Sequence, residues 1–117
     1  DKIAEFNTVG REHVNRFGQF VRQLKERKDT EGRSLLDTTA ILYGSGMGNA
    51  NTHNNSNLPV LVTGGSFRHG SHHAIKRNNP SGSAPLLGDL FLTLMQSMGL
   101  EENRFVNASR NLNELLL

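Results

Sequence analysis

Histidines supply the first side chains in this sequence that could bind a metal or transfer a proton. His53 lies between Asn51 and Asn54, in a stretch rich in Gly and Asn. Neutral imidazole is a common zinc ligand, and it also carries protons near neutral pH. A single imidazole in a polar loop is more often simply solvated, so His53 needs further ligands before it defines a metal site.

A second group of histidines and the three methionines each have a simpler interpretation than metal binding. Neighbouring imidazoles chelate zinc or copper when another ligand and a rigid frame complete the site. No Cys or acidic residue lies near this group, so we interpret it as exposed residues of a polar, His-rich excursion over 66–80. The histidines concerned are His69, His72 and His73. Three methionines are interpreted as packing residues, the last two on the core face of a helix: Met47, Met95 and Met98.

The run Gly44-Ser45-Gly46-Met47-Gly48 could be taken for a phosphate-binding loop. A dinucleotide-binding turn requires a helix directly after its glycines, and a Walker loop requires Gly-Lys followed by Ser or Thr. The sequence meets neither requirement, because residues 49–59 have no helical pattern. Nor is Ser45 in a hydrolase nucleophile elbow, since Tyr43 occupies the first glycine position of Gly-x-Ser-x-Gly. The glycines therefore predict a sharp turn at the end of a strand.

Hydrophobic periodicity predicts the elements that position these residues. Apolar residues recur at three- and four-residue spacing over residues 2–27, which predicts one long amphipathic helix. Short β-prone runs predict buried strands at 38–44 and 59–63. The loop between them, residues 44–58, is long for a compact domain, and this favours a functional role for it.

A second amphipathic helix is predicted over 84–99, with Ser83 as its N-cap. The order of elements is typical of an α/β fold in which two long helices cover a sheet. Because two strands do not make a stable sheet alone, we expect other residues to complete it, from the remainder of a parent chain or from another subunit. The predicted core residues are Phe17, Phe20, Leu24, Leu90, Phe91 and Leu94.

Composition narrows the class of protein. The chain has 117 residues and 35% hydrophobic residues, which fits one domain at most. A net charge of +2 without a basic, aromatic stripe argues against nucleic acid as a partner, and no apolar run is long enough to span a membrane. The absence of Cys excludes disulfides and thiolate metal sites. Because the chain begins within a helical pattern and ends on three leucines, we expect it to be a piece of a longer protein.

The stretch from Gln23 to Gly48 resembles the C-terminal part of alkaline-phosphatase-like proteins such as sulfatases and cofactor-independent phosphoglycerate mutases. In those proteins a helix, a Leu-x-Asp-x-Thr lead-in and a strand precede Thr-Ser/Ala-Asp-His-Gly. A loop with another His then runs into a Pro-led strand, as Thr52-His53 runs into Leu58-Pro59 here. Most of residues 20–117 resembles the C-terminal region of the bacterial domain of unknown function 1552 family, typical of planctomycetes and related bacteria.

This resemblance implies a three-layer alkaline-phosphatase-like fold, in which the long helices pack on strands of a larger, mostly parallel sheet. Residues 1–117 would then be a single segment, the C-terminal part of that domain. In active members of the superfamily, an Asp-His pair after the strand and a later loop His bind two metals that activate a nucleophile. The corresponding positions here are Gly46, Met47 and His53. Glycine offers no side-chain ligand and a thioether is a poor ligand for zinc or magnesium, so the implied metal site is degenerate.

Two functions follow from the resemblance. In the first, the protein is a non-catalytic binding or structural component of the bacterial envelope or secretome, since losing two ligands usually abolishes metal binding. In the second, it is a metal-dependent hydrolase of phosphate or sulfate esters, with an altered site that uses His53, one divalent metal and residues upstream of this chain. We expect no catalysis by residues 1–117 alone. The predicted binding residues are Ser45, Asn49 and Asn51, and the family resemblance implies a periplasmic or secreted location.

Overall fold

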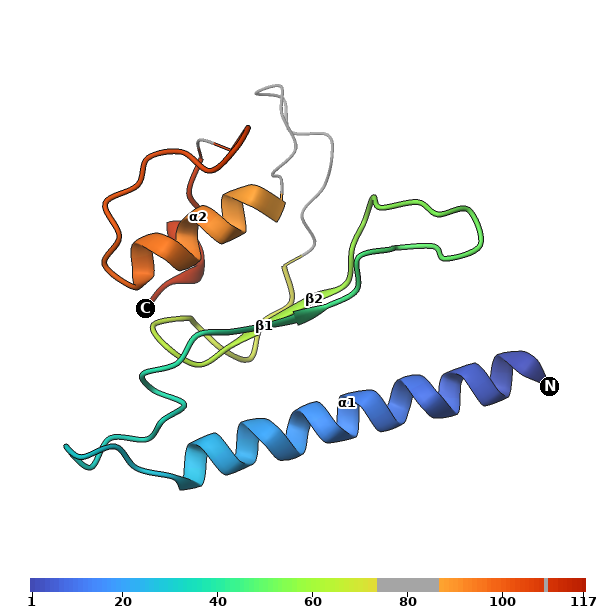
Figure 1. Cartoon of the computed structure of the whole chain (residues 1–117), viewed down its shortest axis with the longest axis horizontal. Coiled ribbons are helices and arrows are strands. Elements are labelled where there is room, and N and C mark those ends of the chain that lie inside the picture. Colours follow the sequence, from blue (N-terminus) through green and yellow to red (C-terminus); the bar gives the residue numbers. More distant parts are fainter. Residues whose placement is uncertain (74–86, 109) are drawn as a thin grey trace. The chain divides into compact units, whose positions relative to one another are not determined.

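A computed structural model describes residues 1–73, 87–108 and 110–117 of the chain (Figure 1). These residues form two compact units, Asp1–Thr39 and Ala40–Leu117. The first unit contains one long helix and a turn. The second contains two strands, a helix and a short 3-10 helix, so the chain has the mixed α and β content that the sequence predicts.

Helix α1, Lys2–Glu26, confirms the predicted long helix with a difference of one residue at its C-terminal end. Asp1 caps it, because its Oδ1 accepts a hydrogen bond from the backbone N–H of Ile3 at 3.1 Å. Arg27 ends it in an extended conformation. None of its residues is buried, and Phe20 is 48% exposed. The prediction that Phe20 lies in a core is therefore wrong, and Phe17 and Leu24 are only partly buried.

A turn closes the first unit on the C-terminal end of α1. The buried hydroxyl of Ser34 donates to the carbonyl oxygens of Leu24 and Lys25, at 3.2 and 2.9 Å. These are two of the carbonyls that a helix end leaves without an intrahelical partner. Asp29 organises the turn itself, because its carboxylate accepts from the backbone N–H groups of Glu31 and Arg33 and from the Arg33 guanidinium.

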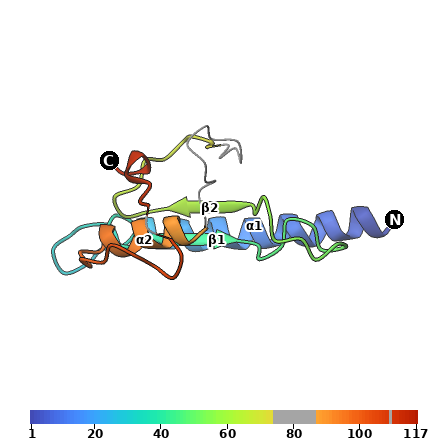
Figure 2. The same cartoon turned by 90° about the horizontal axis from the view of Figure 1, so that it is seen from above.

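Strands β1, Ile41–Gly44, and β2, Val60–Thr63, form a two-stranded antiparallel sheet in the second unit. Ile41 pairs with Thr63 and Gly44 with Val60. Both strands lie within the predicted runs but begin later than residues 38 and 59. The expectation of a mostly parallel sheet is not supported, because parallel neighbours need a crossover, usually helical, whereas residues 45–59 return directly as a hairpin loop. Figure 2 shows the two strands side by side.

Helix α2, Leu87–Ser97, and the 3-10 helix η1, Asn113–Leu115, complete the second unit. The helix lies within the predicted range of 84–99, although residues 84–86 lie outside the described part of the chain. Leu90 is buried, which confirms it as a core residue, and Leu94 packs partly buried against the same cluster. Phe91 is half-buried and contacts Phe105 edge to face, with ring centroids 5.7 Å apart.

The core of the second unit also uses residues that periodicity does not identify. Phe67 and Leu112 are each 2% exposed and pack with Leu90. Phe67 belongs to the predicted polar excursion over 66–80, of which residues 74–80 lie outside the described residues. Partly buried side chains from both strands and from the C-terminal segment pack against this cluster: Ala40, Leu42, Val60, Val62, Leu94, Leu115 and Leu116.

Candidate functional site

The loop of residues 45–59 connects β1 to β2 and extends beyond the ends of both strands (Figure 1). It is closed near its tip by an isolated antiparallel bridge between Asn49 and Asn54. The N–H of Asn54 donates to the carbonyl of Asn49 at 3.0 Å, and the carbonyl of Asn54 accepts from Gly48 and Asn49 at 2.8 and 3.3 Å. The loop is therefore a small hairpin with its own backbone hydrogen bonds, and its tip consists of residues 50–53.

Ser45, a predicted binding residue, uses its hydroxyl inside the loop. The Oγ of Ser45 donates to the carbonyl of Met47 at 2.9 Å and accepts from the Met47 N–H at 3.2 Å. At the base of the loop, the Ser45 N–H donates to the carbonyl of Pro59 at 3.2 Å. Ser45 therefore shapes the turn after β1, and a ligand would have to compete with these bonds to use its hydroxyl.

Asn49, the second predicted binding residue, has a comparable local role. Its side-chain Oδ1 accepts from the backbone N–H groups of Asn51 and Thr52 at 3.0 and 3.3 Å, which is an Asx turn. Asn54 does the same for Ser56 at 2.8 Å. The side chain of Asn51, the third predicted binding residue, is exposed and carries both amide donor and acceptor groups. Asn54 is not among the predicted binding residues, although asparagine side chains commonly accept a hydrogen bond from the backbone two residues further on.

His53, the predicted metal ligand, lies at the tip of the loop with an exposed side chain. Its φ of 51° is in the left-handed region, where only a few per cent of non-glycine residues are found. This backbone conformation turns the chain back toward the bridge at Asn54. Among the described residues, the imidazole makes no hydrogen bond with another side chain.

Two glycines of the turn, Gly48 and Gly46, differ in whether their surroundings leave room for a larger residue. A Cβ atom on Gly48 would lie 2.2 Å from the carbonyl oxygen of Ser56, so a larger residue does not fit there. A Cβ atom on Gly46 would meet no atom within 4 Å. Packing therefore does not require glycine at position 46, which is where the resemblance aligns a metal-binding Asp.

The described residues do not fit the metal centre that the resemblance implies. Within residues 1–73, 87–108 and 110–117, no three His, Cys, Asp or Glu side chains are grouped so that they could hold a metal ion. Gly46 has no side-chain donor, and Met47, 45% exposed, offers only a thioether. The three histidines after β2 are exposed, and among them His73 places Nε2 2.8 Å from the Ser71 hydroxyl. His53 is thus a single candidate ligand.

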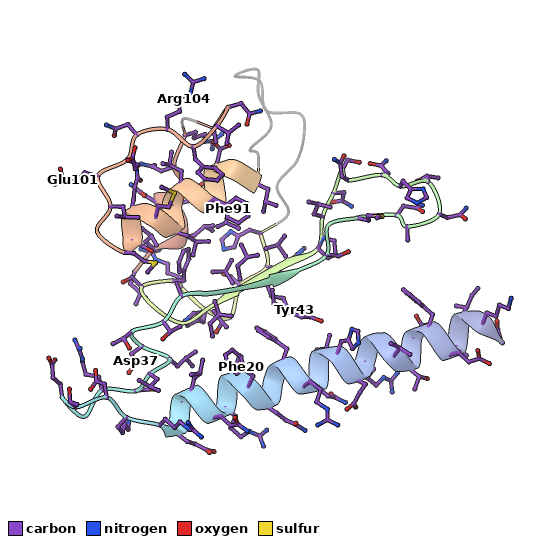
Figure 3. The ribbon with its side chains drawn as sticks, in the orientation of Figure 1. Phe20, Asp37, Tyr43, Phe91, Glu101 and Arg104 are labelled. Carbon is purple, nitrogen blue, oxygen red and sulfur yellow. The ribbon has the colours of Figure 1, made fainter. Side chains whose placement is uncertain are left out.

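A second candidate site is an apolar groove beside α2, with a volume of about 280 Å³. The prediction that Met98 packs on the core face of the helix is wrong, because Met98 is 75% exposed, whereas Met95 is partly buried. The loop that follows α2 carries Glu101 and Arg104, both labelled in Figure 3 with Phe91. The side chains lining the groove are all apolar: Phe91, Leu94, Met95, Met98, Leu100 and Phe105.

Comparison with known proteins does not identify a family for this chain. No family model, no curated protein and no solved structure matches the sequence. Within the described residues, no helix is both long and apolar enough to cross a membrane. The class that the structure defines is a small mixed α/β chain with a two-stranded antiparallel sheet.

Proposed function

We propose that this chain is part of an alkaline-phosphatase-like protein of the bacterial envelope or secretome, and that it acts as a non-catalytic binding component. The observation that carries the proposal is the form of the loop of residues 45–59. Asn49 and Asn54 make hydrogen bonds within the loop, while Asn51 and His53 are exposed at the tip. A preorganised loop loses little conformational entropy when it binds, which favours recognition by hydrogen bonds.

The chemistry of the residues after β1 supports a binding role over a catalytic one. Gly46 and Met47 stand where active relatives in the proposed superfamily have Asp and His, and neither supplies an oxygen or nitrogen ligand. Metal affinity depends on the number and geometry of ligands, so His53 alone does not retain a catalytic metal. The proposed role of this region is therefore contact with another molecule through polar side chains.

The proposal includes a partner for the sheet, either the remainder of a parent chain or another subunit. The Ser45 N–H bond to the Pro59 carbonyl fixes which backbone groups of the strands point away from the partner strand. Those of Leu42 and Gly44 lie on one outer edge, where they have no backbone partner among the described residues. Those of Val60 and Val62 lie on the other edge. A two-stranded hairpin is marginally stable at best, and additional strands would satisfy these groups.

One observation favours a second function, a metal-dependent hydrolase of phosphate or sulfate esters with an altered site. His53 is exposed at the end of the loop beyond β1, and its imidazole is free to coordinate one divalent metal together with residues outside this chain. In this alternative the nucleophile and most of the ligands lie upstream. His53 then serves as one ligand of a site that the 117 residues do not complete.

Elemental metal analysis of the full-length protein, beside its His53→Ala variant, distinguishes the two functions. A binding component is expected to contain no stoichiometric metal in either form, and to leave aryl phosphate and aryl sulfate esters intact. Stoichiometric zinc, iron, manganese or calcium that is lost in the variant would overturn the proposal and favour the hydrolase. Asn51→Ala, which changes an exposed side chain of the same tip without removing an imidazole, is the matched control.

A further inference from the structure

The apolar groove beside α2 has features of a docking site for a basic amphipathic helix. Every residue that lines it is apolar, and two of them are methionines, which adapt their shape to a partner. The loop that joins the lining residues Leu100 and Phe105 contains two acidic residues, Glu101 and Glu102, and one basic residue, Arg104. Glu101 and Glu102 are exposed and follow the lining residue Leu100 directly. Apolar grooves bind amphipathic helices through apolar anchor residues, and the exposed carboxylates of Glu101 and Glu102 favour a helix that also carries Lys or Arg.

The second half of α1 and the residues just after it have the complementary character. Residues 16–28 contain five basic residues and one acidic residue, Glu26. Phe20, on the apolar face of the helix, is 48% exposed and supplies an aromatic anchor. Lys25 lies beside that face in the last turn of α1, and Lys28 follows the helix end, both with exposed side chains. This segment therefore offers both the aromatic group and the charges that the groove accepts.

From this complementarity we propose that the groove binds α1 of a second copy of the chain. Phe20 of one copy enters the groove between Met98 and Phe105 of the other, while Lys25 and Lys28 approach Glu101 and Glu102. Two copies related by a twofold axis would form two equal contacts of this kind. The inference does not depend on the proposed binding function of the loop at residues 45–59.

Sedimentation equilibrium measures the dimer dissociation constant of the chain and tests the apolar contact first. Phe20→Ser is expected to weaken the dimer by about tenfold or more, because an aromatic anchor at the centre of an interface contributes much of its affinity. Phe6→Ser is the matched control, since Phe6 is on the same helix, is 73% exposed and lies outside the basic segment. Equal effects of the two variants, or a chain that is monomeric at all concentrations, would overturn the proposal.

Charge reversal then tests which surfaces meet. Charge reversal of either surface is expected to weaken the dimer by about tenfold at low salt. One variant combines Glu101→Lys with Glu102→Lys, and the other combines Lys25→Glu with Lys28→Glu. Mixing the two doubly substituted chains should restore both contacts, one with the wild-type charges and one with the charges exchanged, and the chain with all four substitutions should restore both with the charges exchanged. Glu114→Lys, an exposed acidic residue of η1, serves as the control for charge alone. Failure of the fourfold variant to recover the dimer excludes this contact between copies.

Discussion

Thr93 and Leu112, nineteen positions apart in the sequence, are joined by a buried hydrogen bond. The Thr93 Oγ1 accepts from the Leu112 N–H at 2.8 Å and donates to the carbonyl of Asp89, also at 2.8 Å. Thr93 is completely buried, and Leu112 belongs to the same hydrophobic core as Phe67. The Thr93 hydroxyl thus gives the Leu112 N–H a hydrogen-bond acceptor at the point where the C-terminal segment enters the core of the second unit.

Replacing Thr93 by Val should destabilise the chain, because the substitution keeps the shape of the side chain but leaves the buried Leu112 N–H without an acceptor. The expected loss is about 1–3 kcal/mol of unfolding free energy, measured by urea denaturation. Thr8→Val provides the comparison, since Thr8 makes only an exposed bond to Ala4 in α1. Equal stabilities of the two variants would show that the Thr93 hydrogen bond contributes nothing measurable.

Replacing Gly48 by Ala should disrupt the loop of residues 45–59. The new Cβ would lie 2.2 Å from the Ser56 carbonyl oxygen, so the backbone must move and the bridge between Asn49 and Asn54 must weaken. Overpacking of this kind costs about 1–3 kcal/mol. Amide hydrogen exchange at Asn54 should accelerate, whereas Gly46→Ala, where the Cβ meets no atom within 4 Å, should leave the rate unchanged. Similar exchange rates in both variants would contradict the close approach of Gly48 to Ser56.

Acid should weaken the turn that closes the end of α1. Desolvation acts to raise the pKa of Asp29, but the hydrogen bonds from Arg33 and Glu31 and the charge of Arg33 outweigh it, so the pKa lies below its ordinary value of 3.8. The folded chain therefore binds fewer protons than the unfolded chain in this range. The contribution of Asp29 to stability is complete above pH 3.8 and is lost as the pH falls through the lower folded pKa.

Circular dichroism of α1 during denaturation, at a series of acidic pH values, measures this dependence. Asp29→Asn keeps an oxygen acceptor for the two N–H groups but does not titrate, so its unfolding free energy should change less with pH below 3.8 than that of the wild type. Glu31→Gln, next to the same Arg33 guanidinium but more exposed, should behave like the wild type. An unchanged pH profile in Asp29→Asn would refute the assignment.

Restoring donors after β1 should create metal affinity if the resemblance assigns the ligands correctly. The double variant Gly46→Asp with Met47→His places a carboxylate and an imidazole on the loop that also carries His53, and position 46 has room for the side chain. Zinc titration by calorimetry should show binding at least about tenfold tighter than in the wild type, because affinity rises with the number of suitable ligands. Adding His53→Ala should remove the gain. A gain that persists without His53 would refute its alignment with the superfamily's loop histidine.

Much of the local structure follows from the sequence alone. Helical spacing of apolar residues marks α1 almost to its ends, and the β-prone runs locate both strands, because such patterns depend on neighbouring residues. The polar loop between the strands, and the exposure of Asn51 and His53 in it, follow from the same composition. Sequence did not reveal that Ser45 and Asn49 use their oxygen atoms within the loop, since those bonds depend on the backbone conformation.

Only the tertiary structure decided how the elements pair and what they bury. Periodicity cannot distinguish parallel from antiparallel strands, whereas the hairpin course of residues 45–59 imposes the antiparallel register. Phe67 and Leu112 lie in segments without a periodic pattern, yet they are buried because the C-terminal segment pairs with residues 66–68 and packs on α2. Phe20 has the spacing of a core residue and is nonetheless half-exposed. The physical reason is the same in each case: burial depends on contacts between residues far apart in the chain. A local pattern indicates only which residues could make such contacts.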